Sequence, residues 1–553
     1  MCEIWDYIVV GAGSAGCVVA ERLSADGKSR VLVLEAGGDD DSPWIALPKG
    51  VAKLVMDPKH IWAYAVTQPR IAGEPAGEVW IRGRGIGGSS SINGMIWSRG
   101  EPRDYDDWAA AGADGWDGAA MTAAFKTLED HELGASDMRG AGGAVNVAPK
   151  LHTYPLAETM MRAGVQMGLK PVDDLNGTTG DRVGFYSHNI KRGRRQSAAT
   201  TFLNPARKRA NVKVVTGAAA ERIVIENGRA IAIKATVHGH PRRFDVSGEI
   251  IVAAGAIESP LLLQRSGIGP AERLRAAGIT PVVDSPDVGE RMREHLAFSI
   301  PHRLKDDIGV GRSFHGVGLA LAMARYWLTR RGIMGTGPFE VGAFANVADS
   351  SGRTDTQFYL GGYTFALSDD NHPVPLGSID KKPGISIYAQ LLRLTSEGAV
   401  RVTGPRSSDA PQIEPNWLST PEDQASAVAS VRFMRRYMAQ DALAPLIERE
   451  LLPGAACQSD ADILNVFRRL STCGLHGVGT CRMGADNRAV VDPRLKVNGV
   501  AGLRVVDCSV MPGPVTGNTN APAMAVGLRA AGMILEDRGW VADQRVGPQV
   551  DTD

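Results

Sequence analysis

Asp6-Tyr7-Ile8-Val9-Val10-Gly11-Ala12-Gly13-Ser14-Ala15-Gly16 is the stretch of this sequence that decides its fold. Its first five residues form a short, β-branched apolar run that is typical of a buried strand. The G-x-G-x-x-G turn that follows leads into an apolar-periodic helix, and a second strand at 30–34 ends in Glu35. The order strand, turn, helix, strand, acid predicts a Rossmann-like dinucleotide-binding unit.

Each glycine of the turn has its own physical task. Gly11 permits the tight turn, Gly13 lets a pyrophosphate approach the backbone, and Gly16 lets the helix pack closely on the strand. The helix N-terminus offers free N–H groups and positive partial charge to phosphates. Glu35 is placed to hydrogen-bond ribose hydroxyls, and its charge would repel a 2′-phosphate. The turn alone does not distinguish NAD from FAD.

Length and composition limit the classes of protein to consider. With 553 residues the chain is expected to form two to four domains. Lysine plus arginine equals aspartate plus glutamate, 61 each, so no net charge attracts nucleic acid or an anionic membrane. The 65 glycines exceed the usual ~7% of residues, and no repeat or low-complexity block explains them. They indicate many tight turns and close approaches of backbone to ligand.

Location signals point to a cytoplasmic protein. The chain opens directly into a strand, with no basic and apolar leader. The longest apolar tract, Val317–Leu328, is interrupted by Arg325 and is much shorter than the ~20 residues of a membrane span. The six cysteines show no C-x-x-C spacing, which favours a reducing compartment.

A second glycine-rich loop, Gly83–Gly94, is too rich in glycine and serine to be a core element. Such a loop is suited to wrap backbone amides and hydroxyls around a planar or phosphorylated ligand. A solvated linker is the alternative, but the immediate return to apolar sequence at Met95-Ile96-Trp97 favours the ligand loop.

Periodicity predicts the other elements. A helix is expected at 155–167, antiparallel strands at 212–216, 221–225 and 230–238, and a buried strand at 248–255. Ser259 and Pro260 have the types of an N-cap and first-turn proline for a helix to Arg265. From about 300 to 467 the pattern changes to strands at 358–360 and 385–392 and a helix at 421–438. The last part holds a strand at 503–507 and an almost wholly apolar helix from Asn520 to Leu535, which is expected to be buried.

Taken together, several blocks resemble the glucose–methanol–choline (GMC) flavoprotein oxidoreductases, in that family's order and over nearly the whole chain. The blocks are Asp6–Gly16 with Glu35-Ala36-Gly37, Gly83–Asn93, Gly255–Pro260 with Ser266–Pro270, Asp287–His295, and His476–Thr480 with Met483-Gly484, Leu503–Asp507 and Asn518–Asn520.

The resemblance implies an α/β fold with two domains. A Rossmann-like FAD-binding domain would comprise 1–150, 196–300 and 468–553, and an α+β substrate-binding domain would comprise 151–195 and 301–467. His476 would be the catalytic base and Asn518 its partner. The implied FAD-binding residues are Gly11, Gly13, Ser14, Ala15, Gly16, Glu35, Ala36, Trp62, Arg84, Ile86, Gly88, Ser89, Asn93, Gly94, Met95, Ile96, Ala220, Asp507, Cys508, Asn518, Thr519 and Asn520. Some relatives attach FAD through a histidine in the first signature; this chain has Ile92 there, so non-covalent FAD is expected.

The expected chemistry is oxidation of a primary alcohol, aromatic alcohols included, to an aldehyde. A neutral imidazole is suited to accept the hydroxyl proton near pH 7, and FAD is then reoxidised by oxygen or another acceptor. A hydroxynitrile lyase with redox-silent FAD is the main alternative; a non-catalytic flavin protein and an NAD enzyme are weaker ones. The sequence leaves the particular alcohol, the acceptor and the oligomeric state open.

Single residues also have plainer interpretations. His476 could be structural and Asn518 could cap a turn, and for His295 a structural hydrogen bond is the favoured interpretation. Cys473 and Cys481 flank His476, but two thiols and one histidine make no recognisable metal site, so no metal is expected.

Overall fold

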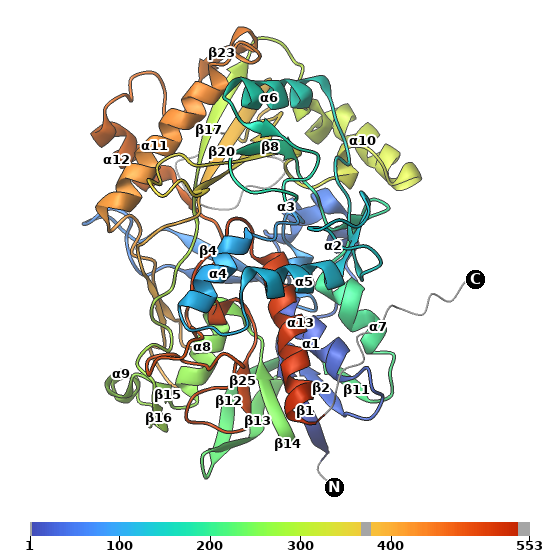
Figure 1. Cartoon of the computed structure of the whole chain (residues 1–553), viewed down its shortest axis with the longest axis vertical. Helices are drawn as coiled ribbons and strands as arrows, with labels where there is room; N and C mark the ends of the chain where they lie inside the picture. Colours follow the sequence, from blue (N-terminus) through green and yellow to red (C-terminus); the bar gives the residue numbers. More distant parts are fainter. Residues whose placement is uncertain (1–2, 367–377, 540–553) are drawn as a thin grey trace.

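The computed structural model describes residues 3–366 and 378–539. Two large sheets organise the chain, with the first below and the second above in Figure 1. The first sheet has β1 (Ile4–Val10) between β2 (Val31–Leu34) and β14 (His240–Val252), all parallel. β25 (Leu503–Val505) runs parallel to the end of β14. The predicted succession of strand, turn, helix and strand is therefore present, with α1 (Ser14–Leu23) following β1.

The strand at 212–216 was expected to be antiparallel to its successors, and this is wrong. β11 (Val212–Val215) lies at the outer edge of β2 and is parallel to it. Only β12 (Ala218–Glu226) and β13 (Arg229–Val237) form an antiparallel pair, which continues onto β14. Alternation of side chains shows which face of a strand is apolar and carries no information about strand direction, which explains the error.

The helix predicted to start at Ser259 starts earlier. α8 runs from Gly255 to Arg265 with Pro260 inside it. Proline has no N–H to donate to the carbonyl four residues back, and the hydroxyl of Thr480 donates to that Ala256 carbonyl instead, at 2.7 Å. Ser259 is not an N-cap; its hydroxyl donates to Asp507 at 2.5 Å.

The second sheet has the order β23-β17-β20-β19-β18-β8-β7, with β24 beside β17. Phe358 and Leu360 in β19 pack into an apolar core together with helix residues such as Met160 and Met434. Because alternate residues of a strand face opposite ways, Gln357 and Tyr359 lie on the other face, towards the first sheet. The strands are β7 (Lys170–Pro171), β8 (Arg182–Phe185), β17 (Leu296–Leu304), β18 (Val341–Ala345), β19 (Thr356–Gly361), β20 (Gly384–Leu391), β23 (Ile447–Glu450) and β24 (Thr472–Cys473), and the helices are α6 (Pro155–Gln166), α11 (Pro421–Met438) and α12 (Asp460–Leu470).

The apolar C-terminal helix, α13 (Asn520–Asp537), is buried and lies beside α1 (Figure 1). The two helices approach so closely that a Cβ on Gly527 would lie 2.7 Å from the Ala15 carbonyl oxygen. Smaller elements complete the chain: α2 (Pro43–Ala46), α3 (Val51–Leu54), β3 (Ile61–Ala65), β4 (Val79–Gly83), α4 (Pro102–Ala110), α5 (Gly118–Leu128), β5 (Glu129–His131), β6 (Val145–Val147), β9 (Ile190–Lys191), β10 (Arg194–Arg195), α7 (Asn204–Ala206), β15 (Ile268–Gly269), α9 (Ala271–Ala276), β16 (Val283–Asp284), α10 (Gly316–Thr329), β21 (Ala399–Arg401) and β22 (Gln412–Glu414).

Candidate active site

The predicted ligand turn lies at the carboxyl edge of the first sheet. Gly11 follows β1 with φ of +102°, and a Cβ at this position would lie 2.4 Å from the Ala253 carbonyl oxygen. A Cβ on Gly16 would lie 2.0 Å from the Gly11 carbonyl oxygen. Neither position accepts a side chain, so the turn keeps its backbone exposed at the start of α1.

Two helix N-termini meet at this turn. The hydroxyl of Ser14, in the first turn of α1, donates to Oδ1 of Asn520, in the first turn of α13, at 2.8 Å. Neither helix has a side-chain cap within the described residues, and the buried Nδ2 of Asn520 has no hydrogen-bond partner among them. The first N–H groups of a helix carry positive partial charge and need partners. The pair therefore forms a site suited to anionic groups such as a pyrophosphate.

Glu35 connects the turn to the second glycine loop. Its carboxylate accepts N–H bonds from Ala12 (2.9 Å), Gly37 (2.8 Å) and Gly85 (3.1 Å). Burial raises the pKa of Glu35. Each carboxylate oxygen accepts more than one hydrogen bond, so capacity for a ribose hydroxyl remains. The loop packs directly on the turn, because a Cβ on Gly88 would lie 2.8 Å from the Gly13 Cα.

Sequence reasoning missed Arg195, which holds the end of this loop. Its buried guanidinium donates to the carbonyls of Ile45 (3.0 Å) and Asn93 (2.7 Å) and to Oδ1 of Asn93 (2.7 Å). Burial lowers the pKa of Arg195 to about 9. Asn93 Oδ1 also accepts the N–H of Met95, whose φ of +59° is unusual for a residue with a side chain. The arginine thus fixes a strained turn in the segment expected to contact the flavin.

The predicted cofactor residues come from several separate segments of the chain. Most lie on the turns that follow the parallel strands or on the Gly83–Gly94 loop; Trp62 lies in β3, with the Arg84 guanidinium 4.7 Å from its ring centroid. Asp507 is used internally, since it accepts bonds from Gly255, Ser259 and Ser509. The remaining positions are Gly13, Ala15 and Gly16 at the start of α1, Ala36 after β2, Ile86, Gly88, Ser89, Gly94 and Ile96 on and after the loop, Ala220 in β12, Cys508 after β25, and Asn518 and Thr519 before α13.

His476 and Asn518 lie in contact. Nε2 of His476 is 3.1 Å from Nδ2 of Asn518. The backbone N–H of His476 donates to Glu294 at 2.5 Å, which fixes the loop that carries the imidazole. Nδ1 of His476 lies 3.1 Å from Nδ1 of His295. His295, expected to be a structural hydrogen bonder, is therefore bonded to the predicted base itself.

The orientation of the amides around His476 follows from a backbone carbonyl. The Phe358 carbonyl can only accept, so the Tyr186 hydroxyl donates to it (2.7 Å) and in turn accepts from Nε2 of Gln357 (3.1 Å). Gln357 Nε2 also donates to Oδ1 of Asn518 (3.2 Å). Asn518 therefore presents its NH₂ to His476, whose Nε2 must be an acceptor.

The tautomer of His476 is thereby determined. With a lone pair on Nε2, a neutral imidazole carries its proton on Nδ1 and donates it to His295. Burial, with smaller contributions from His295 and Arg82, holds the pKa of His476 well below its usual range. Burial lowers the pKa of His295 to about 3. Both rings are therefore neutral at pH 7, and Nε2 of His476 is an available base.

The sequence showed no residues between 300 and 467 that would hold the catalytic pair or a substrate, but in the structure this part of the chain contacts His476 and Asn518. Besides Gln357, Tyr359 accepts from Asn518 (3.2 Å), and the side-chain amide of Gln390 lies 3.1 Å from Nδ1 of His476. Because Nδ1 carries the proton in this tautomer, the amide of Gln390 must face it with its oxygen. A signal was present in the sequence: polar Gln357 and Tyr359 alternate with Phe358 and Leu360 in one strand. In a fully buried strand, polar residues at every second position indicate that one face of the strand forms a buried hydrogen-bond network.

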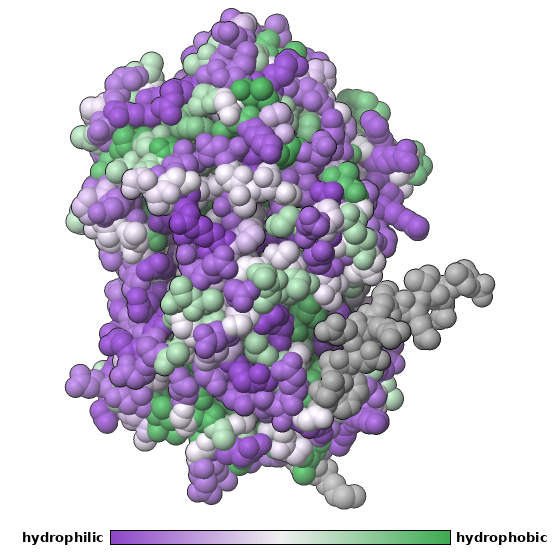
Figure 2. All heavy atoms as spheres, in the orientation of Figure 1, coloured by the Kyte–Doolittle hydropathy of each residue, from purple (hydrophilic) through white to green (hydrophobic). Residues whose placement is uncertain are grey.

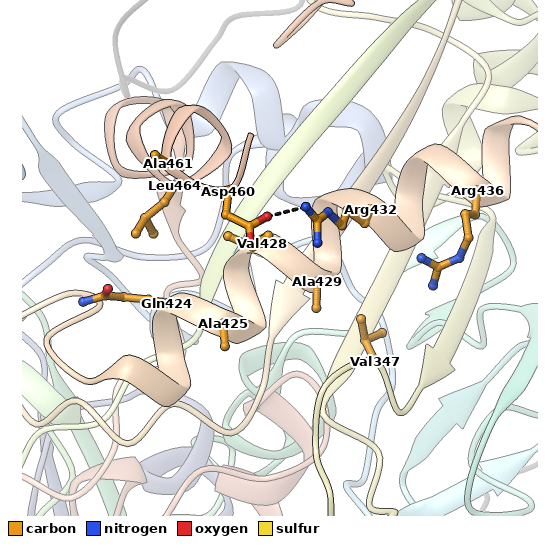
Figure 3. A pocket seen from close by; sticks show the side chains of 10 residues that line it. All are labelled: Val347, Gln424, Ala425, Val428, Ala429, Arg432, Arg436, Asp460, Ala461 and Leu464. Carbon is orange, nitrogen blue, oxygen red and sulfur yellow. Dashed lines mark hydrogen bonds and ion pairs between the residues drawn. The ribbon is translucent and has the colours of Figure 1, made fainter. Parts of the chain in front are cut away.

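One surface groove lies apart from His476 and Asn518. It has a volume of about 500 Å³ and runs between α11 and α12 (Figure 3). Its floor is apolar, with Val428, Ala429 and Leu464, and its polar members are mainly the ion pair Arg432–Asp460 and Arg436. None of these groups acts on His476 or Asn518. Among residues 3–366 and 378–539 no cluster of metal-ligating side chains is found.

A glycine turn flanked by uncapped helix N-termini, near a neutral imidazole, is the arrangement expected of a dinucleotide-dependent oxidoreductase. Family profiles agree: those described as the GMC oxidoreductase N- and C-terminal domains match residues 5–297 and 395–527. The alcohol dehydrogenase [acceptor] of Pseudomonas putida is 36% identical over 538 residues, 96% of each chain. The oxygen-dependent choline dehydrogenase of a Rhizobium etli strain is 36% identical over 532 residues, 96% of this chain and 95% of that one.

Solved structures show the same architecture. Pyridoxine 4-oxidase from Mesorbium loti has a TM-score of 0.84 and 30% identity over 96% of this chain and 98% of its own. The chain therefore belongs to the GMC oxidoreductase family, and the predicted fold is confirmed. It is a flavoprotein oxidoreductase, and FAD is its cofactor. The residues present fit that group, because the two uncapped helix N-termini suit the pyrophosphate and the unpartnered Asn520 Nδ2 offers a further donor.

Proposed function

We propose that this protein oxidises a primary alcohol, aromatic alcohols included, to the aldehyde, with His476 as the base. One observation carries the proposal: the tautomer of His476 is set so that its Nε2 lone pair lies beside the NH₂ of Asn518. The base and the hydrogen-bond donor are thus directed at the same position, where a substrate hydroxyl would lie. A hydroxyl that loses its proton needs both a base and a donor that stabilises the resulting alkoxide.

The protein groups divide the work. His476 Nε2 accepts the hydroxyl proton, and Asn518 donates a hydrogen bond that strengthens as alkoxide character develops on the oxygen. His295 accepts from Nδ1 of His476 and so keeps the imidazole oriented. FAD, held at the N-termini of α1 and α13, would supply the hydride acceptor. The uncapped N-terminus of α13 favours negative charge on whatever lies against it.

The surroundings of the pair support an aromatic substrate. Tyr359, which touches Asn518, packs on Tyr186 and Phe339 with centroid distances of 5.5 Å each. Phe339 in turn lies 5.1 Å from Tyr388. Aromatic faces at these spacings favour a planar apolar ligand. The side-chain contacts of His476 and Asn518 are to amides, an imidazole and a hydroxyl. The nearby carboxylate of Glu294 accepts the backbone N–H of His476 and is paired with Arg82 at 3.3 Å, which leaves it less suited to attract a cationic alcohol.

Non-covalent binding of FAD is part of the proposal. Ile92, at the position where a histidine would form the covalent bond, is buried in an apolar cluster with Ile45, Leu54 and Ile81. An isoleucine side chain cannot form that bond. Acid precipitation should release all of the yellow cofactor into the supernatant; cofactor retained by the pellet would contradict this part.

Anaerobic stopped-flow reduction of the flavin tests the reaction. Benzyl alcohol, cyclohexylmethanol, hexanol, 1-phenylethanol and choline form a panel in which ring, chain, substitution and charge vary separately. We expect benzyl alcohol to reduce the flavin fastest and 1-phenylethanol poorly. Preference for choline, or reduction by no primary alcohol, would overturn the substrate class. Admission of air, or of a quinone, then identifies the acceptor.

His476→Ala tests the base. Loss of a general base costs typically ~10²–10⁴-fold in rate, and FAD should remain bound. His302→Ala is the matched control, since His302 is a buried histidine in β17 whose ring contacts the Ile300 carbonyl. Equal reduction rates in both variants would refute the assignment. No observation favours a hydroxynitrile lyase; cleavage of mandelonitrile without flavin reduction would reveal one.

A further inference from the structure

Helix α10 (Gly316–Thr329) has an apolar face on the outside of the protein. Its inner face, with Met323 and Tyr326, packs on the core around Phe314. Its outer face exposes Val317 (76%), Leu321 (65%) and Leu328 (85%), and Trp327 (47%) lies at its edge. Ala320 and Ala324 lie between them and are also exposed. These positions follow the spacing i, i+3, i+4, i+7 of one helical stripe, turned towards solvent.

Part of the stripe is visible at the surface. Figure 2 shows apolar residues at the right edge of the upper part of the molecule, where α10 lies in Figure 1, next to strongly hydrophilic ones. A helix that is apolar on all sides is normally covered. A group of exposed apolar residues on one helix face is typical of an interaction surface.

Basic residues gather at the C-terminal end of the stripe. The tip of the β9–β10 hairpin abuts this end: the Tyr326 hydroxyl donates to the Gly193 carbonyl at 3.0 Å, and a Cβ on Gly193 would lie 2.0 Å from the Arg330 carbonyl oxygen. The cations of the hairpin and helix end are Lys191, Arg192, Arg194, Arg325, Arg330 and Arg331.

No ion pair among the described residues neutralises this cluster. The sequence has no aspartate or glutamate from 308 to 339 or from 182 to 220, and none of the six cations forms an ion pair with a carboxylate in the described part of the chain. Arg330 instead lies over the Tyr326 and Trp327 rings, at 5.0 and 4.7 Å. The overall charge of the chain is zero, but this surface is locally positive.

We propose that α10 and the β9–β10 hairpin form a docking surface for an anionic lipid bilayer. An interfacial helix lies in the membrane plane with its apolar face at the acyl boundary, Trp at the edge and Lys or Arg at the headgroups. The arrangement of Leu321, Leu328, Trp327 and the arginines matches each of these requirements. Charge complementarity selects this occupant, since the six cations are suited to anionic headgroups and none of them is ion-paired in the described residues.

The docking is peripheral and requires no membrane span. No helix in residues 3–366 and 378–539 is long and apolar enough to cross a bilayer. The 14 residues of α10 form a helix of ~21 Å, which lies within the interface rather than across it. The proposal is independent of the substrate proposed above.

Flotation of the FAD-loaded protein with vesicles tests the proposal. Vesicles of phosphatidylcholine with one-quarter phosphatidylglycerol should carry the protein upward, and vesicles of phosphatidylcholine alone should carry at least tenfold less. Raising the ionic strength until the Debye length falls to ~3 Å should remove most of the difference. Equal binding to both vesicles, or binding to neither, would overturn the proposal.

Two double variants separate the apolar and basic parts. Leu321→Glu/Leu328→Glu should abolish flotation, whereas the control Val165→Glu/Val282→Glu, which changes exposed apolar residues elsewhere (46% and 47%), should not. Arg194→Glu/Arg331→Glu should weaken binding at least about twentyfold, since each basic residue near an anionic surface contributes roughly fivefold. The absorption spectrum of bound FAD confirms that each variant is folded.

Light scattering without lipid tests whether a second copy of the chain, rather than a bilayer, covers this surface. If the native protein is a dimer that Leu321→Glu/Leu328→Glu makes monomeric, and vesicles do not bind it, the surface joins two copies of the chain and the lipid proposal is wrong. An unchanged oligomeric state together with lost flotation supports it.

Discussion

Tyr186→Phe should slow flavin reduction although Tyr186 lies three hydrogen bonds away from His476. The substitution keeps the ring, which packs 5.5 Å from Tyr359, and removes only the hydroxyl. That hydroxyl is the link through which the Phe358 carbonyl fixes Gln357. Without it, the amides of Gln357 and then Asn518 are held less firmly in this orientation and turn over more often. A turned Asn518 presents its oxygen to His476, which favours a proton on Nε2 and removes the base.

The size of the effect follows from the bonds lost. One hydrogen bond between neutral groups contributes ~1 kcal/mol net, and the Tyr359 bond to Gln357 remains (2.9 Å). Losing ~1 kcal/mol of bias leaves the competent amide orientation populated to at least about one half, so the reducing rate should fall by up to about twofold. Leaving the buried Phe358 carbonyl and Gln357 amide unpaired should also cost ~1–3 kcal/mol in the free energy of unfolding.

Stopped-flow reduction and urea unfolding should be measured on the same preparations. Tyr437→Phe is the matched control, since the buried Tyr437 hydroxyl donates to the Met160 carbonyl (2.8 Å), outside this network. It should lose similar stability and keep its reducing rate. ¹⁵N NMR of His476 should show a pyridine-type Nε2 in the native protein and a mixed signal in Tyr186→Phe. If the two variants reduce the flavin equally fast, the tautomer argument is refuted.

Three further predictions concern the fold around the site. Gly16→Ala should cost ~1–3 kcal/mol and weaken FAD retention, because its Cβ would lie 2.0 Å from the Gly11 carbonyl oxygen; unchanged Tm and flavin content would contradict this. Arg195→Met should unpair buried carbonyls at ~1–3 kcal/mol each and release FAD, whereas the exposed neighbour Arg194→Met should not, as Tm and flavin absorbance would show. Burial holds the pKa values of His188 and His295 at about 3, below the ~6.5 of unfolded chains, so the unfolded state binds more protons below pH 6.5. Stability should fall there by up to ~1.4 kcal/mol per pH unit for each histidine, and urea unfolding at pH 6.5 and 5.5 should show a flatter slope for His188→Gln.

How far the sequence predicts this molecule depends on the range of the contacts. The β1–α1 turn, the helix at 421–438 and the buried C-terminal helix follow from local patterns, because glycine geometry and apolar periodicity act over a few residues. The direction of β11 and the start of α8 do not follow, because they depend on a free strand edge and on a hydroxyl supplied by Thr480 from far along the chain.

The residues of the site also differ in how far the sequence predicts them. His476 and Asn518 were named from motifs, whereas Gln357, Gln390 and Tyr359 come from a sheet whose register only the folded chain sets. His295 was assigned to structure from its sequence, yet it lies 3.1 Å from the ring of His476. No spacing in the sequence shows that two residues 181 positions apart share a proton.

The site is therefore a property of the contact between the two sheets. The C-terminal part of the chain supplies His476 and Asn518, and the second sheet supplies the amides and hydroxyls that orient them. Neither set is sufficient, since an unoriented imidazole has its lone pair on either nitrogen. Exchanging the second sheet for that of a relative should then change the rate of reduction even if each substrate contact is retained. The hydrogen-bond network from the Phe358 carbonyl to His476 explains why. The Phe358 carbonyl can only accept, and the bonds through Tyr186, Gln357 and Asn518 therefore fix which nitrogen of His476 is the base.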